Sequence, residues 1–558
     1  MTNRDFEHRI DSLFAAWDKP DSPGAAVLVM KDGETIFKKG YGFANLEHNV
    51  PIEPTTVFHV ASVSKQFTAM AIAILAHEGK LSLDDRVQKH VPELPEFEHP
   101  ITVRHLVHHV SGLRDQWELL TLAGWRMDDV ITTEHLIKII THQKNLNFEP
   151  GSKYLYSNSG YTLMALIVER VSGKPFPEYL REAILEPLAM RNSHVHDDHQ
   201  LIVKNRAYSY SPKERGGFKK SILSYANFGA TSLFTTVEDL AKWMMNYTTA
   251  KVGGPEVISQ MHERYTLTNG KTIDYAFGLM YKEYKGLQLI YHTGSDAGFR
   301  TYFGRFPEQG LGIIILSNVS SFPREPMAMK IADIFLEDEN TKQEGAKPAE
   351  FTRIAYTACP GTYLVKSLGK LLEVHFADGR LSIQLEGWPE PLELVKTDAT
   401  ETRKCLEEDE FFESDSFTTK HKEAQVTFIS EEGKINQLMP SPYQLMLNTY
   451  GEDMGAEKIE VKSLLEQELT EYVGAYYSHE LGTTYYLNII DGQLVAQHRR
   501  HNDIILIATR KDRFLAKTGP LSRLDFVRNE QNAISGLNNT GSRGFNLKFE
   551  KQASLLFA

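Results

Sequence analysis

A serine and a lysine three residues apart, Ser62 and Lys65, are the first pair of side chains here that could catalyse a reaction. An apolar run over residues 68–76 follows them and Gly79 ends it, so the sequence predicts a buried helix that begins near Ser62. Three helical residues span about 300° of rotation, which brings the lysine amine within reach of the hydroxyl. The pair would supply a nucleophile and a base, and the N–H groups at the helix start would favour an oxyanion.

The Ser-x-x-Lys spacing is not specific by itself, because a chain of 558 residues should contain it roughly once or twice by chance. It recurs at Ser367 and Lys370, in a strand-rich stretch with no following helix. We interpret that second copy as a turn. The assignment of Ser62 therefore depends on the residues that accompany it.

Two further motifs contain residues that could act together with Ser62 and Lys65. Tyr156 and Asn158 follow a Pro-Gly turn and precede a helical pattern, so a phenol and an amide would point the same way from one loop. His292, Thr293, Gly294 and Ser295 form or end a strand just before the turn at residues 296–298. Each motif alone is more often structural, but the three together favour an acylation site.

In these three motifs the chain resembles the serine hydrolases that comprise class C β-lactamases, penicillin-binding proteins and D-aminopeptidases. Ser62/Lys65, Tyr156/Asn158 and His292/Thr293/Gly294 match the family pattern in order and at similar intervals, and the resemblance covers roughly residues 5–335.

The resemblance implies a role for each residue of these motifs. Ser62 would attack an acyl carbon while Lys65 and Tyr156 share the hydroxyl proton, and each base needs its pKa lowered from about 10. Asn158 would hold Lys65 and a substrate amide. Substrate binding would also use His292, Thr293, Gly294 and Ser295, and the backbone N–H groups of Ser62 and Ser295 would form the oxyanion hole.

His292 departs from the β-lactamases of the group, which place a lysine there. A histidine is only partly charged at pH 7 and offers no permanent cation to a substrate carboxylate. His292 resembles instead the D-aminopeptidases, D-alanyl carboxypeptidases and related esterases. We therefore expect β-lactam hydrolysis to be a side reaction.

The elements that must position these residues point to an α+β fold. Residues 24–40 read as a hairpin that turns at Asp32 and Gly33, and strands return at residues 289–306 and 310–318. Helical patterns lie between, including residues 102–107, residues 160–171 and a helix capped at residues 82–85. This order predicts a sheet built from both ends of the region with a helical insertion between. The resemblance implies that it is a β-lactamase-like domain over residues 1–340, with an antiparallel sheet flanked by helices and a helical subdomain.

A polar linker at residues 337–348 separates this region from a second half made of short alternating strands. That half repeats itself: Gly361 matches Gly474, and Asp378-Gly379 matches Asp491-Gly492, at an offset of 113 residues. We expect two antiparallel β-barrels, at residues 350–455 and 465–558. The resemblance to D-aminopeptidase implies lipocalin-like barrels, one of which restricts the active site through a loop, for which residues 529–546 are our candidate.

Composition excludes several classes of function. The net charge of −12, without a long basic block, gives no footprint for nucleic acid or an anionic membrane surface. No apolar run approaches the roughly 18 residues of a membrane span, and the N-terminal residues lack the features of a secretion signal. We expect a cytoplasmic protein, or a periplasmic or secreted one if a leader was removed.

The number of cysteines and the spacing of the histidines argue against a metal-binding site. Cys359 and Cys405 are too few for a disulfide framework or a four-cysteine zinc site. We interpret them as ordinary thiols, with a single bridge between them as the open alternative. His105 and His109 lie four apart on a predicted helix, but the glutamate of a zinc-protease motif is missing. We expect no cofactor and no metal.

Three functional hypotheses remain. The first is a metal-independent serine hydrolase of small amides, peptides or esters, with D-amino-acid compounds favoured. The second is a carboxylesterase or a D,D-carboxypeptidase of the penicillin-binding type. The third is a catalytically silent binding protein. The expected partners are a small-molecule or short-peptide substrate, with a second copy of the chain as an open alternative.

Overall fold

The computed structural model describes residues 3–213, 215–336, the strands between residues 361 and 459 given below, and residues 462–553 except 463 and 518. The chain forms two compact units. The first contains Met1–Leu113, Arg126–His142 and Phe148–Lys342, and the second contains Arg114–Trp125, Gln143–Asn147 and Gln343–Ala558.

The first unit is built on a six-stranded antiparallel sheet with the order β12-β13-β14-β15-β1-β2. Its strands are β1 (Ala25–Lys31), β2 (Glu34–Tyr41), β12 (Met280–Tyr284), β13 (Leu287–Asp296), β14 (Phe299–Phe306) and β15 (Leu311–Ser317). The β1–β2 turn has positive φ at Asp32 (52°) and Gly33 (85°), which confirms the predicted hairpin. Because β1 pairs with β15, both ends of this region contribute to one sheet, as predicted.

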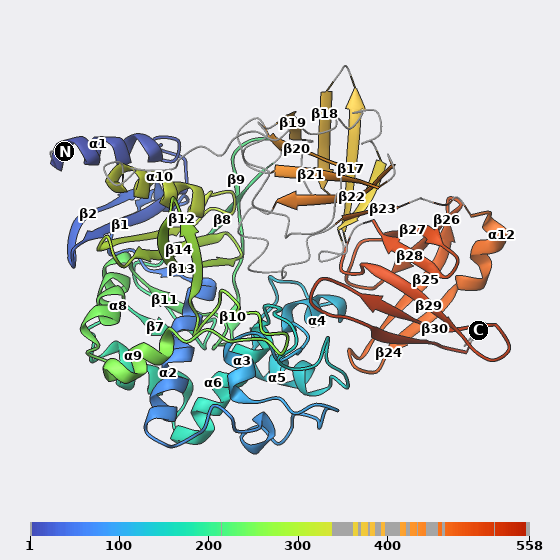
Figure 1. Cartoon of the computed structure of the whole chain (residues 1–558), viewed down its shortest axis with the longest axis horizontal. Helices are drawn as coiled ribbons and strands as arrows, with labels where there is room; N and C mark the ends of the chain where they lie inside the picture. The colour runs from blue at the N-terminus through green and yellow to red at the C-terminus, as the bar shows by residue number, and fades with distance from the viewer. Residues whose placement is uncertain are drawn as a thin grey trace. The chain divides into compact units, whose positions relative to one another are not determined.

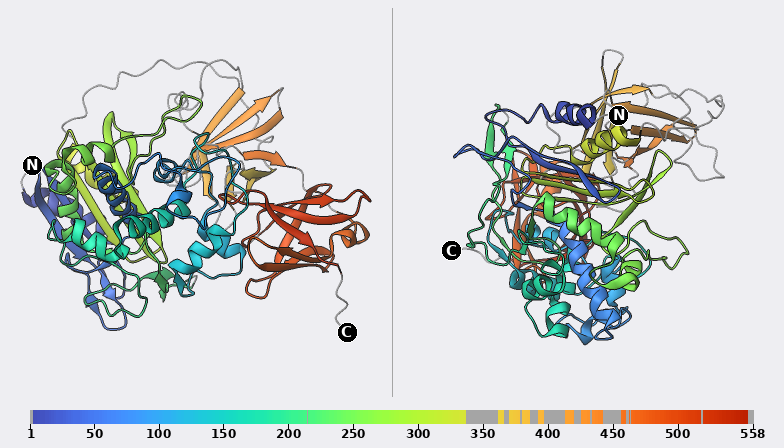
Figure 2. Two further views of the ribbon diagram at one scale, coloured as in Figure 1. Left: turned by 90° about the horizontal axis from the view of Figure 1, so that it is seen from below. Right: turned by 90° about the vertical axis from the view of Figure 1, so that its left-hand side faces the viewer.

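Helices cover both faces of the sheet (Figure 1). Helices α1 (Asn3–Phe14) and α10 (Arg324–Leu336) lie on one face, and α8 (Val237–Thr249) lies on the other. The right panel of Figure 2 shows the same layers from the side. This double cover explains why β1 and β15 are apolar and buried along almost their whole length rather than on alternate residues.

A helical part fills the chain between β2 and β12. Helix α2 is apolar on nearly all sides and packs against α6 and α9, which is why nearly all of its residues are buried. The helices of this part are α2 (Lys65–His77), α3 (Val103–Val107), α5 (Thr133–Thr141), α6 (Asn158–Ser172), α7 (Phe176–Leu180) and α9 (Gly254–Met261). Its short strands are β3 (Phe43–Asn45), β4 (Val50–Pro51), β5 (Phe58–His59), β6 (Ile131–Thr132), β7 (His194–Val195), β8 (Tyr210–Pro212), β9 (Phe218–Lys220), β10 (Tyr225–Ala226) and β11 (Leu233–Thr235).

One predicted helix start is wrong. Residues 82–85 form a turn closed by the Ser82 N–H and the Asp85 carboxylate at 3.0 Å, and only a 3₁₀ turn, Val87–Lys89, follows. The serine and aspartates therefore stabilise a turn rather than cap an α-helix. The same residue types are common in both places, because their side chains hydrogen-bond to nearby backbone N–H groups.

The second unit contains two closed eight-stranded barrels, β16–β23 and β24–β31. The first consists of β16 (Gly361–Val365), β17 (Lys370–Ala377), β18 (Arg380–Leu385), β19 (Leu392–Lys396), β20 (Glu413–Thr419), β21 (Gln425–Glu431), β22 (Lys434–Ser441) and β23 (Ala456–Ile459). After the short α12 (Glu466–Leu469), the second consists of β24 (Gly474–Ser478), β25 (Thr483–Ile490), β26 (Gln493–Gln497), β27 (Ile504–Arg510), β28 (Arg513–Ala516), β29 (Arg523–Arg528), β30 (Ile534–Thr540) and β31 (Leu547–Lys551).

The predicted repeat is confirmed, because β16, β17 and β18 begin 113 residues before β24, β25 and β26. No helix follows the second Ser-x-x-Lys copy, whose Lys370 begins β17. Ser367, the linker, Cys359 and Cys405 lie outside the described residues. The domain boundaries at 340, 350, 455 and 465 stay predictions.

Helix α4 (Gln116–Leu122) belongs to the second unit although it lies between α3 and α5 in sequence. The Arg114 guanidinium, 2% exposed, forms an ion pair of 2.7 Å with Glu480 and donates to the Phe545 carbonyl. The Tyr485 hydroxyl donates to the Leu122 carbonyl at 3.0 Å. No local pattern in the sequence predicts this packing of an early segment against the last barrel. No helix of the described residues is long and apolar enough to cross a membrane.

Candidate active site

Ser62 lies in a tight turn directly before α2. The 3₁₀ turn η1 (Ala61–Ser64) leads into α2, and Ala61 has a φ of 48°, a left-handed conformation that is strained for alanine. Strand β11 holds the turn from one side: Val60 donates to the Leu233 carbonyl and the Leu233 N–H donates to Ser64 Oγ, both at 3.0 Å. The predicted helix start is confirmed, with Ser62 in its 3₁₀ entry.

Lys65 is completely buried and points back at Ser62. Its Nζ lies 3.2 Å from Ser62 Oγ, 2.8 Å from Asn158 Oδ1 and 2.7 Å from the Ala230 carbonyl oxygen. Three oxygen acceptors around one amine fix its position next to the hydroxyl. The Ala230 carbonyl was missed in the sequence, because a backbone group is independent of residue type.

Tyr156 and Asn158 approach Lys65 from the start of α6. Asn158 opens this helix, and Tyr156 lies in the extended segment before it, 5% exposed. The Tyr156 ring centroid is 4.8 Å from Lys65 Nζ and 6.3 Å from the His292 ring centroid. The structure therefore brings the residues of the three motifs together around one lysine.

His109 packs directly against Tyr156, with ring centroids 4.2 Å apart. It sits beyond the end of α3 with a φ of 59°, and the Ser157 N–H donates to its Nδ1 at 3.1 Å. Burial, and then the charge of Lys65, lower the pKa of His109 well below its usual value, so the ring is neutral. His105, the other half of the metal hypothesis, caps the start of α3 through Thr102 instead. Among the described residues no cluster of three His, Cys, Asp or Glu side chains has the arrangement of a metal site.

His292 lies on β13, 1% exposed, at the edge of the same cluster. Its Nδ1 lies 2.7 Å from the Thr293 carbonyl oxygen and its Nε2 lies 3.2 Å from the Tyr275 hydroxyl. Burial, followed by the charge of Lys65, lowers the pKa of His292 to about 3. The expectation of a partly charged histidine is therefore wrong, because burial of the ring disfavours its charged form.

The rest of the motif runs past the Ser62 turn. Gly294 lies so close to it that an added Cβ would be 2.4 Å from the Val60 carbonyl oxygen and 3.0 Å from Ala61 Cβ. Thr293 is 9% exposed and Ser295 is exposed. Only glycine allows the strand to pass this close to the backbone that carries Ser62.

Asp296 was expected only as a turn residue, yet its side chain is 15% exposed and lies beside His59 and Thr231. Thr231 Oγ1 donates to this carboxylate, and His59 Nε2 lies 3.8 Å from it. Burial raises the pKa of Asp296 to about 6, against the lowering effects of the Thr231 hydrogen bond and of Lys65. The only signal in the sequence was an acidic residue directly after His-Thr-Gly-Ser.

Known proteins resemble this chain in both sequence and fold. The model of the family described as Beta-lactamase matches residues 10–335. A D-aminopeptidase of Gluconobacter oxydans (strain 621H) is 26% identical over 379 residues, which are 68% of this chain and 70% of that protein. A D-aminopeptidase of Brucella anthropi is 28% identical over 386 residues, 69% of this chain and 71% of that protein.

Among solved structures, the octameric penicillin-binding protein homologue from Pyrococcus abyssi is 26% identical to this chain with a TM-score of 0.56. The similarity covers 82% of this chain and 100% of that one. The resemblance inferred from the three motifs and the expected α+β fold with additional β-barrels are both confirmed.

Proposed function

This chain belongs to the Beta-lactamase family, and we propose that it is a serine hydrolase that forms an acyl-enzyme with small amides, peptides or esters. D-Amino-acid peptides and amides are the favoured substrates, as the names of the D-aminopeptidase relatives suggest. The observation that carries the proposal is the position of Lys65 Nζ, 3.2 Å from Ser62 Oγ and anchored by Asn158 and Ala230.

In the proposed reaction, Ser62 Oγ attacks the substrate carbonyl carbon and its proton passes to Lys65 Nζ or Tyr156 Oη. The tetrahedral oxyanion is stabilised by the backbone N–H groups of Ser62 and Ser295. The leaving amine or alcohol takes the proton, and water then cleaves the acyl-enzyme and restores the hydroxyl. Asn158 positions Lys65 and a substrate amide, and the reaction needs no cofactor.

The neutral His292 supports substrates without a carboxylate at that position. An esterase of short uncharged esters is therefore our second candidate, ahead of a D,D-carboxypeptidase, whose substrates end in a carboxylate. We also propose that the protein acts in the cytoplasm.

The test is a panel of D- and L-aminoacyl amides, a short-chain ester, a D-Ala-D-Ala peptide and a chromogenic β-lactam. We expect Ser62→Ala to lower kcat by about 1,000-fold or more on every substrate that the wild type hydrolyses, because the nucleophile is gone. Lys65→Ala and Tyr156→Phe should each remove most of kcat. Their double variant should lose less than the product of the two losses, because residues that act as one unit are not additive.

Ser64→Ala is the matched control, since its hydroxyl accepts the Leu233 N–H in the same turn and does not contact Lys65. We expect it to keep activity within about tenfold of the wild type. Wild-type activity in Ser62→Ala would refute the assignment. If a serine-directed acylating probe failed to label Ser62 in an inactive wild type, the silent binding protein would be the correct hypothesis.

A further inference from the structure

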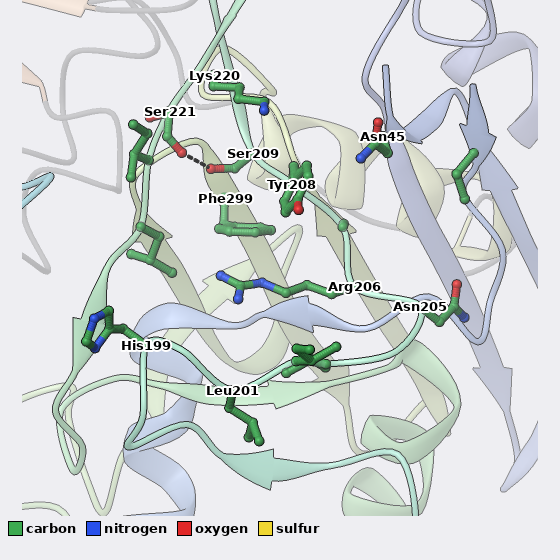
Figure 3. Close-up of a pocket in the computed structure, with 16 residues that line it drawn as sticks. Asn45, His199, Leu201, Asn205, Arg206, Tyr208, Ser209, Lys220, Ser221 and Phe299 are labelled. Atoms are coloured by element: carbon green, nitrogen blue, oxygen red, sulfur yellow. Dashed lines mark hydrogen bonds between the residues drawn. The ribbon is translucent and has the colours of Figure 1, made fainter. Parts of the chain in front are cut away.

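A pocket of about 590 Å³ lies in the first unit apart from the catalytic residues (Figure 3). It is lined by residues of the β3–β4 region, by residues 199–209 and 220–223, and by Phe299 of β14. None of Ser62, Lys65, Tyr156, Asn158 and His292 lines it. Its size is that of pockets that enclose a small organic molecule.

Large hydrophobic side chains that are exposed to water gather at this pocket. Eleven large hydrophobic side chains are exposed among the described residues, and five of them line this pocket. Ile202 is 90% exposed and Ile222 is 56% exposed. The others are Val50, Leu201 and Tyr208. Such a gathering marks a binding surface more often than chance exposure does.

A positive charge, the Arg206 guanidinium, lies among these side chains. Arg206 extends across the pocket between Phe299 and His199 in the view of Figure 3, and its guanidinium stacks on the Phe234 ring at 4.8 Å. Within the described part of the chain no carboxylate forms an ion pair with Arg206, and its Nε is buried without a hydrogen-bond partner. By contrast, Lys220 at the same pocket is paired with Glu47 at 2.8 Å.

Burying half of a guanidinium without an anion lowers the stability of the fold. A bound carboxylate would offset this loss by accepting two parallel hydrogen bonds from the guanidinium. Burial lowers the pKa of Arg206, and the charge of Arg206 in turn helps to lower the pKa of His59, His194 and His196. These histidines are therefore neutral at pH 7. Lys220 is paired with Glu47, so a ligand in this pocket would meet its positive charge at the Arg206 guanidinium.

We propose that this pocket binds an apolar carboxylic acid of small-molecule size, whose carboxylate pairs with Arg206 and whose hydrocarbon chain covers Ile202 and Ile222. The volume of the pocket suits a single small molecule better than a folded partner. The site is independent of acylation at Ser62, so the proposal does not rest on the hydrolase function.

The experiment is calorimetric titration of the full-length chain with decanoate and, in parallel, with 1-decanol, which has the same chain length and no charge. We expect saturable decanoate binding that is equal in wild type and Ser62→Ala, and at least tenfold weaker binding of 1-decanol. Arg206→Gln should weaken decanoate binding at least tenfold and leave 1-decanol binding within twofold.

Two further variants separate the site from general effects. Arg264→Gln removes a guanidinium that also stacks on a ring, that of Tyr281 at 5.3 Å, but lies outside the pocket, and it should change decanoate binding less than twofold. Ile202→Asp changes a side chain so exposed that folding is unaffected, and its like charge should weaken decanoate binding at least fivefold. The absence of decanoate binding, equal binding by Arg206→Gln, or equal affinity for 1-decanol would overturn the proposal.

Discussion

At the scale of single residues, the neutral state of His292 is the feature on which our ranking of the proposed substrates depends. Its ring is enclosed by Tyr275, Tyr156 and the Thr293 carbonyl, and the nearby charge of Lys65 opposes a second positive charge. A pKa of about 3 means that the ring does not titrate between pH 5 and pH 8. His292 therefore orients neighbours through hydrogen bonds and contributes no charge.

His292→Lys would place an ammonium on the same strand position. We expect kcat/KM for D-aminoacyl amides, whose free amine is positively charged, to fall at least about tenfold through like-charge repulsion, and acylation by a chromogenic β-lactam to rise about tenfold. Steady-state rates on both substrates measure the ratio. His292→Gln is the neutral control and should not raise the β-lactam rate. An unchanged ratio in His292→Lys would mean that charge at this position does not select the substrate.

At the scale of elements, α4 depends on a carboxylate that is buried at its contact with the last barrel. Glu118 accepts the Arg543 N–H at 2.7 Å and the Ser542 hydroxyl at 3.1 Å. Its other oxygen, Oε1, lies where a Cβ on Gly541 would be 1.8 Å away, so only glycine fits opposite. Burial raises the pKa of Glu118 to about 7, and the charge of Arg543 does not fully offset it.

This shift predicts that the second unit becomes less stable as pH rises. The folded state holds the Glu118 proton up to about pH 7, whereas the unfolded chain releases it near its ordinary pKa of about 4.3, so the free energy of unfolding falls between these values. We expect Glu118 to account for a loss of about 2 kcal/mol between pH 5 and pH 8. Glu118→Gln should remove this part of the dependence, measured by denaturant unfolding at both pH values.

Glu134→Gln, on the exposed start of α5, is the matched control and should keep the wild-type pH dependence. If Glu118→Gln also kept it, the carboxylate would not be buried as described.

Local patterns in the sequence were sufficient to predict the elements whose conformation is set by residues nearby in the chain. The apolar run of α2, the Asp32-Gly33 turn and the barrel repeat each have a period or a turn residue that is visible in one segment. The packing of α4 has no such signature, because Arg114 and Glu480 are 366 residues apart and each looks like a surface charge. His109 was missed for a related reason: a histidine that supports a tyrosine has the same residue type as one that binds a metal.

At the scale of the whole molecule, the chain leaves its first unit after Leu113 and returns to it at Arg126. The intervening segment is held by groups of the last barrel, among them Glu480, Tyr485 and Arg543. Two units that are connected in this way are not independent modules joined by one linker.

We therefore expect truncation after residue 345 to lower the stability of what remains as well as to change its substrate range. Removing Glu480 alone leaves the Arg114 guanidinium without its ion pair, and breaking a buried pair costs about 3–5 kcal/mol. Calorimetric melting and the substrate panel, applied to the truncated and full-length chains, measure the two effects. Arg114→Ala in the full-length chain separates them, since the barrels stay present. An unchanged substrate range after truncation would exclude a gating role of the barrels.

The passage of α4 into the second unit also has a consequence for synthesis on the ribosome. The segment Arg114–Trp125 emerges from the ribosome several hundred residues before the strands β24 to β31, whose region completes its hydrogen bonds. At a synthesis rate of ~5–20 residues per second, α4 is exposed on the order of tens of seconds before these strands are made. Chaperones that hold apolar segments should therefore bind the stretch Arg114–Trp125 until these strands have been made.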